Sequence, residues 1–304
     1  MNEPNEQRAG LLYGLTAYTL WGMMPLYFTQ LAHVWPLETL SHRVLWSALL
    51  LLVVMLAFGR GSLLVAALSQ PRTRNLLMAS TLLIGINWFV YIYSVATRQA
   101  LHSSLGYYVL PLFNVLLGLV LFGERMRPWQ WFALALAGIG LVFAFYQLGQ
   151  IPWITITLAV SFGFYGLLRK IAPVDALTGL TAETVLLAPL ALILLVTLWC
   201  LGSLDFARTD GGSMALLMLT GVVTTIPLLC FGKAARRLPL TVLGLIQYVS
   251  PSLQFVFAVT VLGEELRPEL RLCFACTWAA LVIFTIEGLV HRTRATEPIP
   301  PVES

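Results

Sequence analysis

Residues 105–128 read LGYYVLPLFNVLLGLVLFGERMRP, and the same pattern returns at residues 245–268 as LIQYVSPSLQFVFAVTVLGEELRP. The two stretches align at an offset of 140 residues, with identities at Leu105, Tyr108, Val109, Pro111, Gly123, Glu124, Arg127 and Pro128. Each stretch is an apolar run long enough for a membrane-spanning helix, followed by a short charged segment. The match therefore predicts an internal repeat whose two copies both enter lipid.

The remainder of the chain is equally apolar. Of its 304 residues 59% are hydrophobic and 11% are charged, against roughly 45–50% and 25% in soluble domains. Runs of ~20 apolar residues occur at 11–31, 36–58, 75–96, 102–122, 129–147, 151–169, 178–200, 213–233, 240–262 and 270–290. Because hydrocarbon offers the backbone no hydrogen-bond partner, each run is expected to be helical. The sequence predicts an all-α integral membrane protein with ten transmembrane helices.

These runs divide into two halves of five, residues 11–147 and 151–290, so the second half must enter the membrane from the opposite side. With residues 1–10 placed in the cytoplasm, 13 Lys and Arg residues fall on that side and four on the other. This asymmetry predicts that both termini are cytoplasmic. Residues 291–304, which contain three prolines, are expected to form a disordered tail. Inverted repeats around a central cavity are typical of secondary transporters, although channels also have them.

Charge and cysteine content exclude several other classes. The net charge of +4 is spread over short loops and forms no basic stripe, so no nucleic-acid partner is expected. The four cysteines lie in apolar runs, where they pack as small apolar groups, and neither a metal site nor a cofactor is predicted. The chain has no GxxxxGK[ST] motif, so it does not use ATP through a P-loop of its own.

The stretch Leu105–Glu124, followed by Arg125 and by Gln130-Trp131, resembles the EamA repeat of the drug/metabolite transporter superfamily. More narrowly, the chain resembles the RarD subfamily. The strings that carry this resemblance are AYTLWG (17–22), HRVLW (42–46), GINW (85–88), SFGFYGLLRK (161–170), TTIPLLCF (224–231) and QYVSP (247–251). They cover about residues 8–290 in both halves. The resemblance implies two five-helix EamA repeats, a bacterial inner membrane and a permease or exporter role.

Charged side chains in apolar runs are costly, so they are the first candidates for function. Glu38, His42 and Arg43 fall within the first two turns of the second run, and Glu38 and His42 share a helical face. They are candidates for proton coupling or for binding a charged solute, since histidine titrates near neutral pH. The alternative is an interfacial salt bridge that seats the helix. Glu183 in the seventh run is the second acidic candidate, with snorkelling to the interface as its alternative.

Polar and aromatic residues inside the runs are the candidates for a solute-binding cavity. They are Tyr18, Trp21, Asn87, Trp88, Tyr107, Tyr108, Asn114, Tyr165, Thr224, Gln247 and Tyr248. The alternative for each is helix packing, and for Asn87 an interhelical hydrogen bond. Pro111 and Pro251, at matching places in the two halves, and Pro227 are candidate hinges or cavity walls, with plain kinks as the alternative.

The function predicted from these observations is secondary active transport of small organic metabolites or drugs by alternating access. The partners are a small organic solute, membrane lipid and, as a candidate coupling ion, the proton. A channel or a lipid scramblase is the alternative class. A membrane-embedded enzyme is a further alternative, but the chain lacks the HExxH spacing of a zinc hydrolase and no enzymatic activity is predicted.

Overall fold

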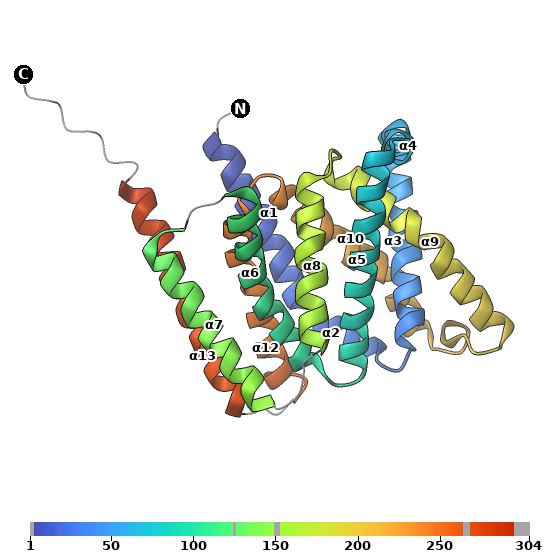
Figure 1. The fold of residues 1–304 in the computed structure, drawn as a ribbon. Coiled ribbons are helices and arrows are strands. Elements are labelled where there is room, and N and C mark those ends of the chain that lie inside the picture. The colour runs from blue at the N-terminus through green and yellow to red at the C-terminus, as the bar shows by residue number, and fades with distance from the viewer. Residues whose placement is uncertain (1–2, 124–125, 149–152, 264–267, 295–304) are drawn as a thin grey trace, which may run out of the picture. The chain divides into compact units, whose positions relative to one another are not determined.

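A computed structural model describes residues 3–123, 126–148, 153–263 and 268–294 (Figure 1). Over these residues the chain is helical and contains no strand. It divides into two compact units, one formed by Met1–Gly118 and Pro152–Glu265, the other by Leu119–Ile151 and Leu266–Ser304. Each unit therefore combines helices from both halves predicted from the sequence. The repeat's Glu124 and Glu264 and residues 295–304 of the predicted tail lie outside the described residues. Residues 291–294, predicted to be disordered, instead continue the helix Pro268–Arg294.

The first unit holds most of the helices. In chain order they are α1 (Glu3–Gly22), α2 (Met24–Phe28), η1 (Thr29–Leu31), α3 (Pro36–Ala57), α4 (Gly61–Ser69), α5 (Pro71–Ala96), most of α6 (Ala100–Phe122), α8 (Trp153–Ile171), α9 (Ala176–Cys200), η2 (Asp205–Ala207), α10 (Gly211–Ala235), α11 (Leu240–Ile246) and α12 (Val249–Thr260). The second unit is built on α7 (Pro128–Leu148) and α13 (Pro268–Arg294), which pack against each other.

Eight stretches within the described residues are long and apolar enough to cross a membrane. They are Pro36–Ala57, Pro71–Ala96, His102–Leu121, Pro128–Gln147, Trp153–Ile171, Ala176–Cys200, Gly211–Ala235 and Val242–Thr260. The surface of α9 shows why lipid is their solvent, because Leu190, Ile193 and Trp199 are each more than 60% exposed. Apolar surface of this extent is unfavourable in water and neutral in hydrocarbon. These helices thus make the chain a multi-pass membrane protein.

Two predicted runs are not single helices. The run 11–31 ends its long helix at Gly22 and continues as α2 and η1, because Pro25 has no N–H and its ring clashes with the carbonyl four residues earlier. The run 240–262 is interrupted at Gln247 and Tyr248. Pro251 accounts for that break in the same way, since it cannot donate to the Gln247 carbonyl. In contrast, α6 continues through Pro111.

Other boundaries also differ from the prediction. α1 begins at Glu3, so residues 3–10 continue the first helix into the polar N-terminus. The segment 59–74 between two predicted runs contains α4. Its nine residues are too few to span a membrane, so the search for long apolar runs did not predict it. Asp175 caps α9 by accepting hydrogen bonds from the backbone N–H groups of Leu177 and Thr178. Burial raises the pKa of Asp175, but hydrogen bonds from Thr178 and the charge of Arg60 outweigh it and leave the pKa below its ordinary value.

The first unit is held together by direct helix packing. α3 packs against α9 and α10, α1 packs against α10 and α12, and α5 lies beside α8 (Figure 1). Ion pairs and hydrogen bonds show that α3 and α9 are antiparallel. Arg60, after the end of α3, pairs with Asp175 before the start of α9 at 2.9 Å. At the other end, Glu38 in the first turn of α3 binds the loop that follows α9.

Close packing of α7 and α13 depends on Gly140. A Cβ at this position would lie 2.7 Å from Cys276 Cβ and 3.2 Å from the Cα of Cys273. Gly138, two positions earlier and so on the opposite side of α7, is open: a Cβ there would meet nothing within 4 Å. The helix pair therefore tolerates a side chain at 138 and excludes one at 140.

Gly140→Ala is expected to destabilise the α7–α13 pair by roughly 1–3 kcal/mol, because the added methyl group must push two backbones apart. Gly138→Ala is the matched control and should be neutral or stabilising by up to about 1 kcal/mol, since alanine favours the helix and meets no neighbour. The measurement is the apparent melting temperature of each detergent-purified variant. Equal shifts for the two variants would show that Gly140 is not a packing position.

Candidate functional site

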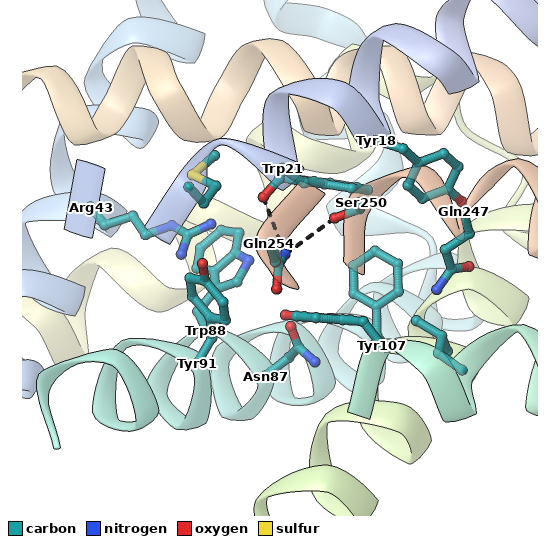
Figure 2. Close-up of a pocket in the computed structure, with 13 residues that line it drawn as sticks. Tyr18, Trp21, Arg43, Asn87, Trp88, Tyr91, Tyr107, Gln247, Ser250 and Gln254 are labelled. Carbon is teal, nitrogen blue, oxygen red and sulfur yellow. Dashed lines mark hydrogen bonds between the residues drawn. The ribbon is translucent and has the colours of Figure 1, made fainter. Parts of the chain in front are cut away.

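The first unit contains a cavity lined by α1, α2, α3, α5, α6, α8, α12 and the break before α12 (Figure 2). Its lining residues are Tyr18, Trp21, Met24, Arg43, Asn87, Trp88, Tyr91, Tyr107, Leu110, Phe162, Gln247, Ser250 and Gln254. Aromatic rings form most of the wall, and amide groups and one arginine supply the polarity. The cavity volume of about 40 Å³ has room for a few water molecules and less than an organic solute needs.

Arg43 is the single charged residue in this lining. Its side chain is 4% exposed, and its Nε donates to Thr224 Oγ1 of α10 at 2.7 Å. The guanidinium carbon lies 4.5 Å from the ring centroid of Trp88 and 5.4 Å from that of Phe28. Such cation–π contacts offset part of the cost of burying the charge. Figure 2 shows the guanidinium directed into the cavity, toward Trp88 and Tyr91.

Polar atoms around the cavity are only partly satisfied. Gln254 Nε2 donates to the Trp21 carbonyl and to Ser250 Oγ, both at 3.2 Å. Gln254 Oε1 and the hydroxyl oxygens of Tyr18 and Tyr91 are buried and make no hydrogen bond to any described residue. Buried polar atoms are normally paired, so this wall is suited to a polar ligand.

Seven of the residues predicted from the sequence line the cavity: Tyr18, Trp21, Arg43, Asn87, Trp88, Tyr107 and Gln247. Asn87 also has the packing role that was its alternative. Its Nδ2 donates to the Leu158 carbonyl at 3.1 Å and to Ser161 Oγ at 3.0 Å, which ties α5 to α8. Asn87 thus forms part of the cavity wall, but its side-chain N–H groups donate to α8.

Four predicted residues lie just behind the wall. Thr224 binds Arg43, and Asn114 Nδ2 donates to Gln247 Oε1 at 3.0 Å. Tyr108 of α6 and Tyr248, in the break before α12, face each other with ring centroids 6.0 Å apart. Thr224 and Asn114 therefore support lining residues, and all four lie outside the lining itself.

Glu183 lies in a separate buried cluster with the predicted residue Tyr165. Glu183 is fully buried, and its carboxylate accepts from Ser80 Oγ at 2.6 Å and from the Tyr165 hydroxyl at 3.2 Å. Arg169 Nη1 lies 3.7 Å from Glu183 Oε1, an ion-pair distance too long for a hydrogen bond. A Cβ at Gly179 would overlap that nitrogen, so glycine makes room for the buried arginine. The cluster ties α5, α8 and α9 together.

The predicted cluster of Glu38, His42 and Arg43 is divided between two places. Glu38 accepts hydrogen bonds from the backbone N–H groups of Asp205 and Phe206 at 2.9 and 2.7 Å. His42 Nε2 lies 3.9 Å from Glu38 Oε1, and its ring stacks on Phe206 with centroids 4.7 Å apart. These two residues hold the α9–α10 loop against the start of α3, whereas Arg43 faces the cavity. These contacts of Glu38 and His42 agree with the alternative interpretation, in which the charged residues hold the end of the helix in place.

The three prolines proposed as hinges have different settings. Pro251 is buried in the first turn of α12, directly after the break that exposes Gln247 to the cavity. Pro227 is buried in the middle of α10, which remains continuous. Pro111 lies within α6. Only Pro251 therefore coincides with an interruption of a helix.

Several lining residues were not among those predicted: Met24, Tyr91, Leu110, Phe162, Ser250 and Gln254. Leu110 and Phe162 are apolar residues in apolar runs, so nothing in their composition distinguishes them from lipid-facing or packing positions. Ser250 and Gln254 sit one turn apart near Gln247 and Pro251, and a search for polar residues beside a proline would have found them. Arg169 is also absent from the predicted residues, because it stands at the very end of the run 151–169, where a charge is expected at a helix end.

Comparison with known proteins agrees with this architecture. The model of the EamA-like transporter family matches residues 8–146. An uncharacterized transporter of Vibrio cholerae is 47% identical over 94% of this chain and 95% of its own length. Protein RarD of Escherichia coli is 38% identical over 97% of this chain and 100% of its own.

A solved crystal structure of a protein 21% identical in sequence superposes with a TM-score of 0.66, covering 91% of this chain and 97% of that one. At this identity the likeness shows a shared fold alone. The full-length relatives and the family match carry the assignment: the chain belongs to the EamA-like transporter family, in the branch that includes RarD, and is a multi-pass membrane transporter.

Proposed function

We propose that the chain is a secondary transporter that carries small organic metabolites or drugs across the bacterial inner membrane by alternating access. The observation that carries this proposal is a cavity inside the first unit with a buried charge, aromatic walls and unsatisfied polar atoms. At about 40 Å³ the cavity is too small for such a solute. Its helices must therefore move to admit one, as alternating access requires.

The helix boundaries support two repeats in the order predicted from the sequence. Four pairs of helices begin 140 residues apart: α3 and α9 at Pro36 and Ala176, α5 and α10 at Pro71 and Gly211, α6 and α11 at Ala100 and Leu240, α7 and α13 at Pro128 and Pro268. With α1 and α8 as the remaining pair, this register supports five helices per half and ten in the chain. An odd number per half implies that the halves are inverted.

Contacts between corresponding residues also support a two-fold relation between the halves. Tyr108 and Tyr248 occupy the same place in the two repeats and contact each other, which is possible only close to an axis that relates them. Arg43 and Glu183 also correspond, each being the eighth residue of its helix. Arg43 of α3 binds a hydroxyl of α10, and Glu183 of α9 binds a hydroxyl of α5, so the paired helices correspond as well.

Two polar clusters lie toward opposite ends of the antiparallel pair α3 and α9, with Arg43 between them. Glu38 holds the α9–α10 loop at one end. Near the start of α9, Glu183 holds Ser80, Tyr165 and Arg169. Polar clusters toward opposite ends of a helix pair can serve a carrier as gates, because opening them in turn would expose the space between them to one side at a time. Both clusters contain an ionisable residue, so the proton is the proposed coupling ion.

We propose that both termini are cytoplasmic, because this orientation places 13 Lys and Arg residues on the cytoplasmic side and four on the other. The Glu38 cluster then lies toward the periplasm and the Glu183 cluster toward the cytoplasm. A reporter fused after Ser304 that is active only in the cytoplasm tests this orientation. Activity of a periplasmic reporter at the same position would reverse it.

The test of the transport proposal is counterflow in proteoliposomes that contain the purified chain. Vesicles are loaded with unlabelled amino acids, organic acids, amines or drugs, and entry of the same labelled compound is followed with and without a pH gradient. A carrier shows saturable entry that is accelerated by unlabelled solute inside, and protein-free vesicles show neither property. Entry that rises linearly with concentration and ignores the internal solute would favour a channel or scramblase instead.

A further inference from the structure

The charge of Arg43 has no acidic partner among the described residues. Every ion pair within the described part of the chain joins other residues, and the two acidic groups closest in sequence or by repeat symmetry, Glu38 and Glu183, are engaged elsewhere. One hydrogen bond, from Nε to Thr224, holds the side chain. The two terminal guanidinium nitrogens make no hydrogen bond to a described residue. A buried cation in this state normally has a partner.

The terminal nitrogens also face the cavity. Arg43 lines it, and its guanidinium carbon lies 4.5 Å from the ring centroid of Trp88. Thr224 restrains the side chain from behind. A guanidinium held at Nε presents its two terminal N–H groups as a fork, and this fork matches the two oxygens of a carboxylate. The arrangement is therefore preorganised for an anion that arrives in the cavity.

The rest of the cavity indicates that the anion is organic. Trp21, Tyr107 and Phe162 provide aromatic surface between the arginine and the far wall. At the far end from Arg43, Figure 2 shows Gln247 and Tyr18, and the Tyr18 hydroxyl is buried without a partner in the described residues. A small inorganic anion would use the arginine and leave this surface without contacts. A molecule with a carboxylate, an apolar body and a second polar group would contact all of it.

We propose that Arg43 binds the carboxylate of the transported solute, so that the substrate class is organic acids with an apolar, preferably aromatic, body. This inference rests on the proposed transport function and adds the charge of the substrate to it. The same chemistry would bind a free inorganic anion, and the experiment below separates the two. A neutral solute would leave the buried guanidinium unpaired, so the site selects against it.

The experiment measures binding by tryptophan fluorescence of the detergent-purified chain, with Trp88 next to Arg43 as the expected reporter. The probes are matched pairs, benzoate with benzamide and phenylacetate with phenylacetamide, together with benzylamine, chloride and sulfate. We expect the carboxylates to bind at least tenfold more tightly than their amides, and benzylamine and the inorganic anions to bind more weakly still. Trp88→Phe identifies the signal that arises in the cavity.

Arg43→Gln is expected to abolish the preference for carboxylates over amides, and Arg43→Lys to retain part of it, because lysine keeps the charge and loses the fork. Arg74→Gln is the matched control. It removes the same charge from an exposed position in the first turn of α5 and should leave the preference unchanged. Arg43→Gln should also raise the melting temperature of the ligand-free protein, since it removes a buried unpaired charge.

A carboxylate preference that survives Arg43→Gln would overturn the proposal, as would amides that bind as well as acids or an absence of carboxylate binding. Chloride or sulfate bound as tightly as the carboxylates would overturn the claim that the anion is organic. A lower melting temperature of Arg43→Gln with an unchanged preference would show a purely structural role. Counterflow of neutral or cationic solutes that is insensitive to Arg43→Gln would support transport and contradict the role of Arg43 in binding the solute. Carboxylate binding that depends on Arg43, without any counterflow, would support the binding role and contradict transport.

Discussion

Glu183→Ala is expected to destabilise the chain by about 3–5 kcal/mol, because it removes one partner of a fully buried ion pair and leaves Arg169 uncompensated. Arg169 is itself 4% exposed, so water cannot replace the lost carboxylate. The substitution also removes the acceptor of Ser80 and Tyr165. At roughly 2–4 °C per kcal/mol, the apparent melting temperature in detergent should fall by on the order of 10 °C. Thermal unfolding of the purified variant followed by fluorescence measures this.

The double variant Glu183→Leu with Arg169→Met is the control for this result. It removes both charges and fills the space with apolar side chains, which is often neutral or stabilising in place of a buried ion pair. We expect it to recover most of the stability that the single change loses. Glu183→Gln should be intermediate, since the amide oxygen still accepts from one hydroxyl. If the double variant is less stable than Glu183→Ala alone, the two residues are not coupled and the ion pair is not what stabilises the cluster.

Glu38→Ala is expected to release the α9–α10 loop from the start of α3. Glu38 is fully buried and accepts two backbone hydrogen bonds from that loop. A hydrogen bond to a charged group contributes about 1.5–3 kcal/mol, so the loss should reach about 3 kcal/mol or more. Because Arg208 is an exposed residue of the same loop, limited trypsin digestion reports the release. Cleavage after Arg208 should become at least tenfold faster in the variant.

A matched change at an exposed ion pair controls for the loss of a carboxylate. Glu6 pairs with Arg237 at 2.8 Å, but both side chains are about one-third exposed. Glu6→Ala should cost less than about 1 kcal/mol and leave cleavage at Arg208 unchanged. Unaltered cleavage in Glu38→Ala would mean that the stacking of His42 on Phe206, or the bond from Trp35 N–H to Asp205 Oδ2, is sufficient to hold the loop.

The helices could be predicted because their boundaries are determined by residues at the boundaries themselves. Pro36, Pro71 and Pro128 each occupy the first position of a helix, where a missing N–H has no cost, and each precedes an apolar run. The break at Gln247 and Tyr248 was not predicted, because Pro111 has the same sequence setting and leaves α6 continuous. Which of two equivalent prolines interrupts its helix depends on the packing around it, and the hydrophobic pattern of the sequence does not show that packing.

The cavity could be predicted in part because a polar side chain contrasts with an apolar run. Arg43, Asn87 and Gln247 were found for this reason, whereas Leu110 and Phe162 have no such contrast. Contacts between residues far apart in the chain were the feature hardest to predict from the sequence. Glu38 binds backbone atoms 167 and 168 residues away, and those donors have no side-chain signature at all. Arg169 ends the apolar run 151–169, which favours an interfacial position, but the absence of a side chain at Gly179 leaves space for it inside the helix bundle.

The opposite charges at the eighth residue of α3 and of α9 bear on how such a chain can have arisen. An ancestor that worked as two identical half-length subunits in opposite orientations would have carried the same residue at both places. A pair of first halves would now bring two arginines to these places, and a pair of second halves would bring two glutamates. If the proposed inverted repeats arose by duplication, the two halves have since diverged at this position, and a homodimer of either half would lack the combination of arginine and glutamate.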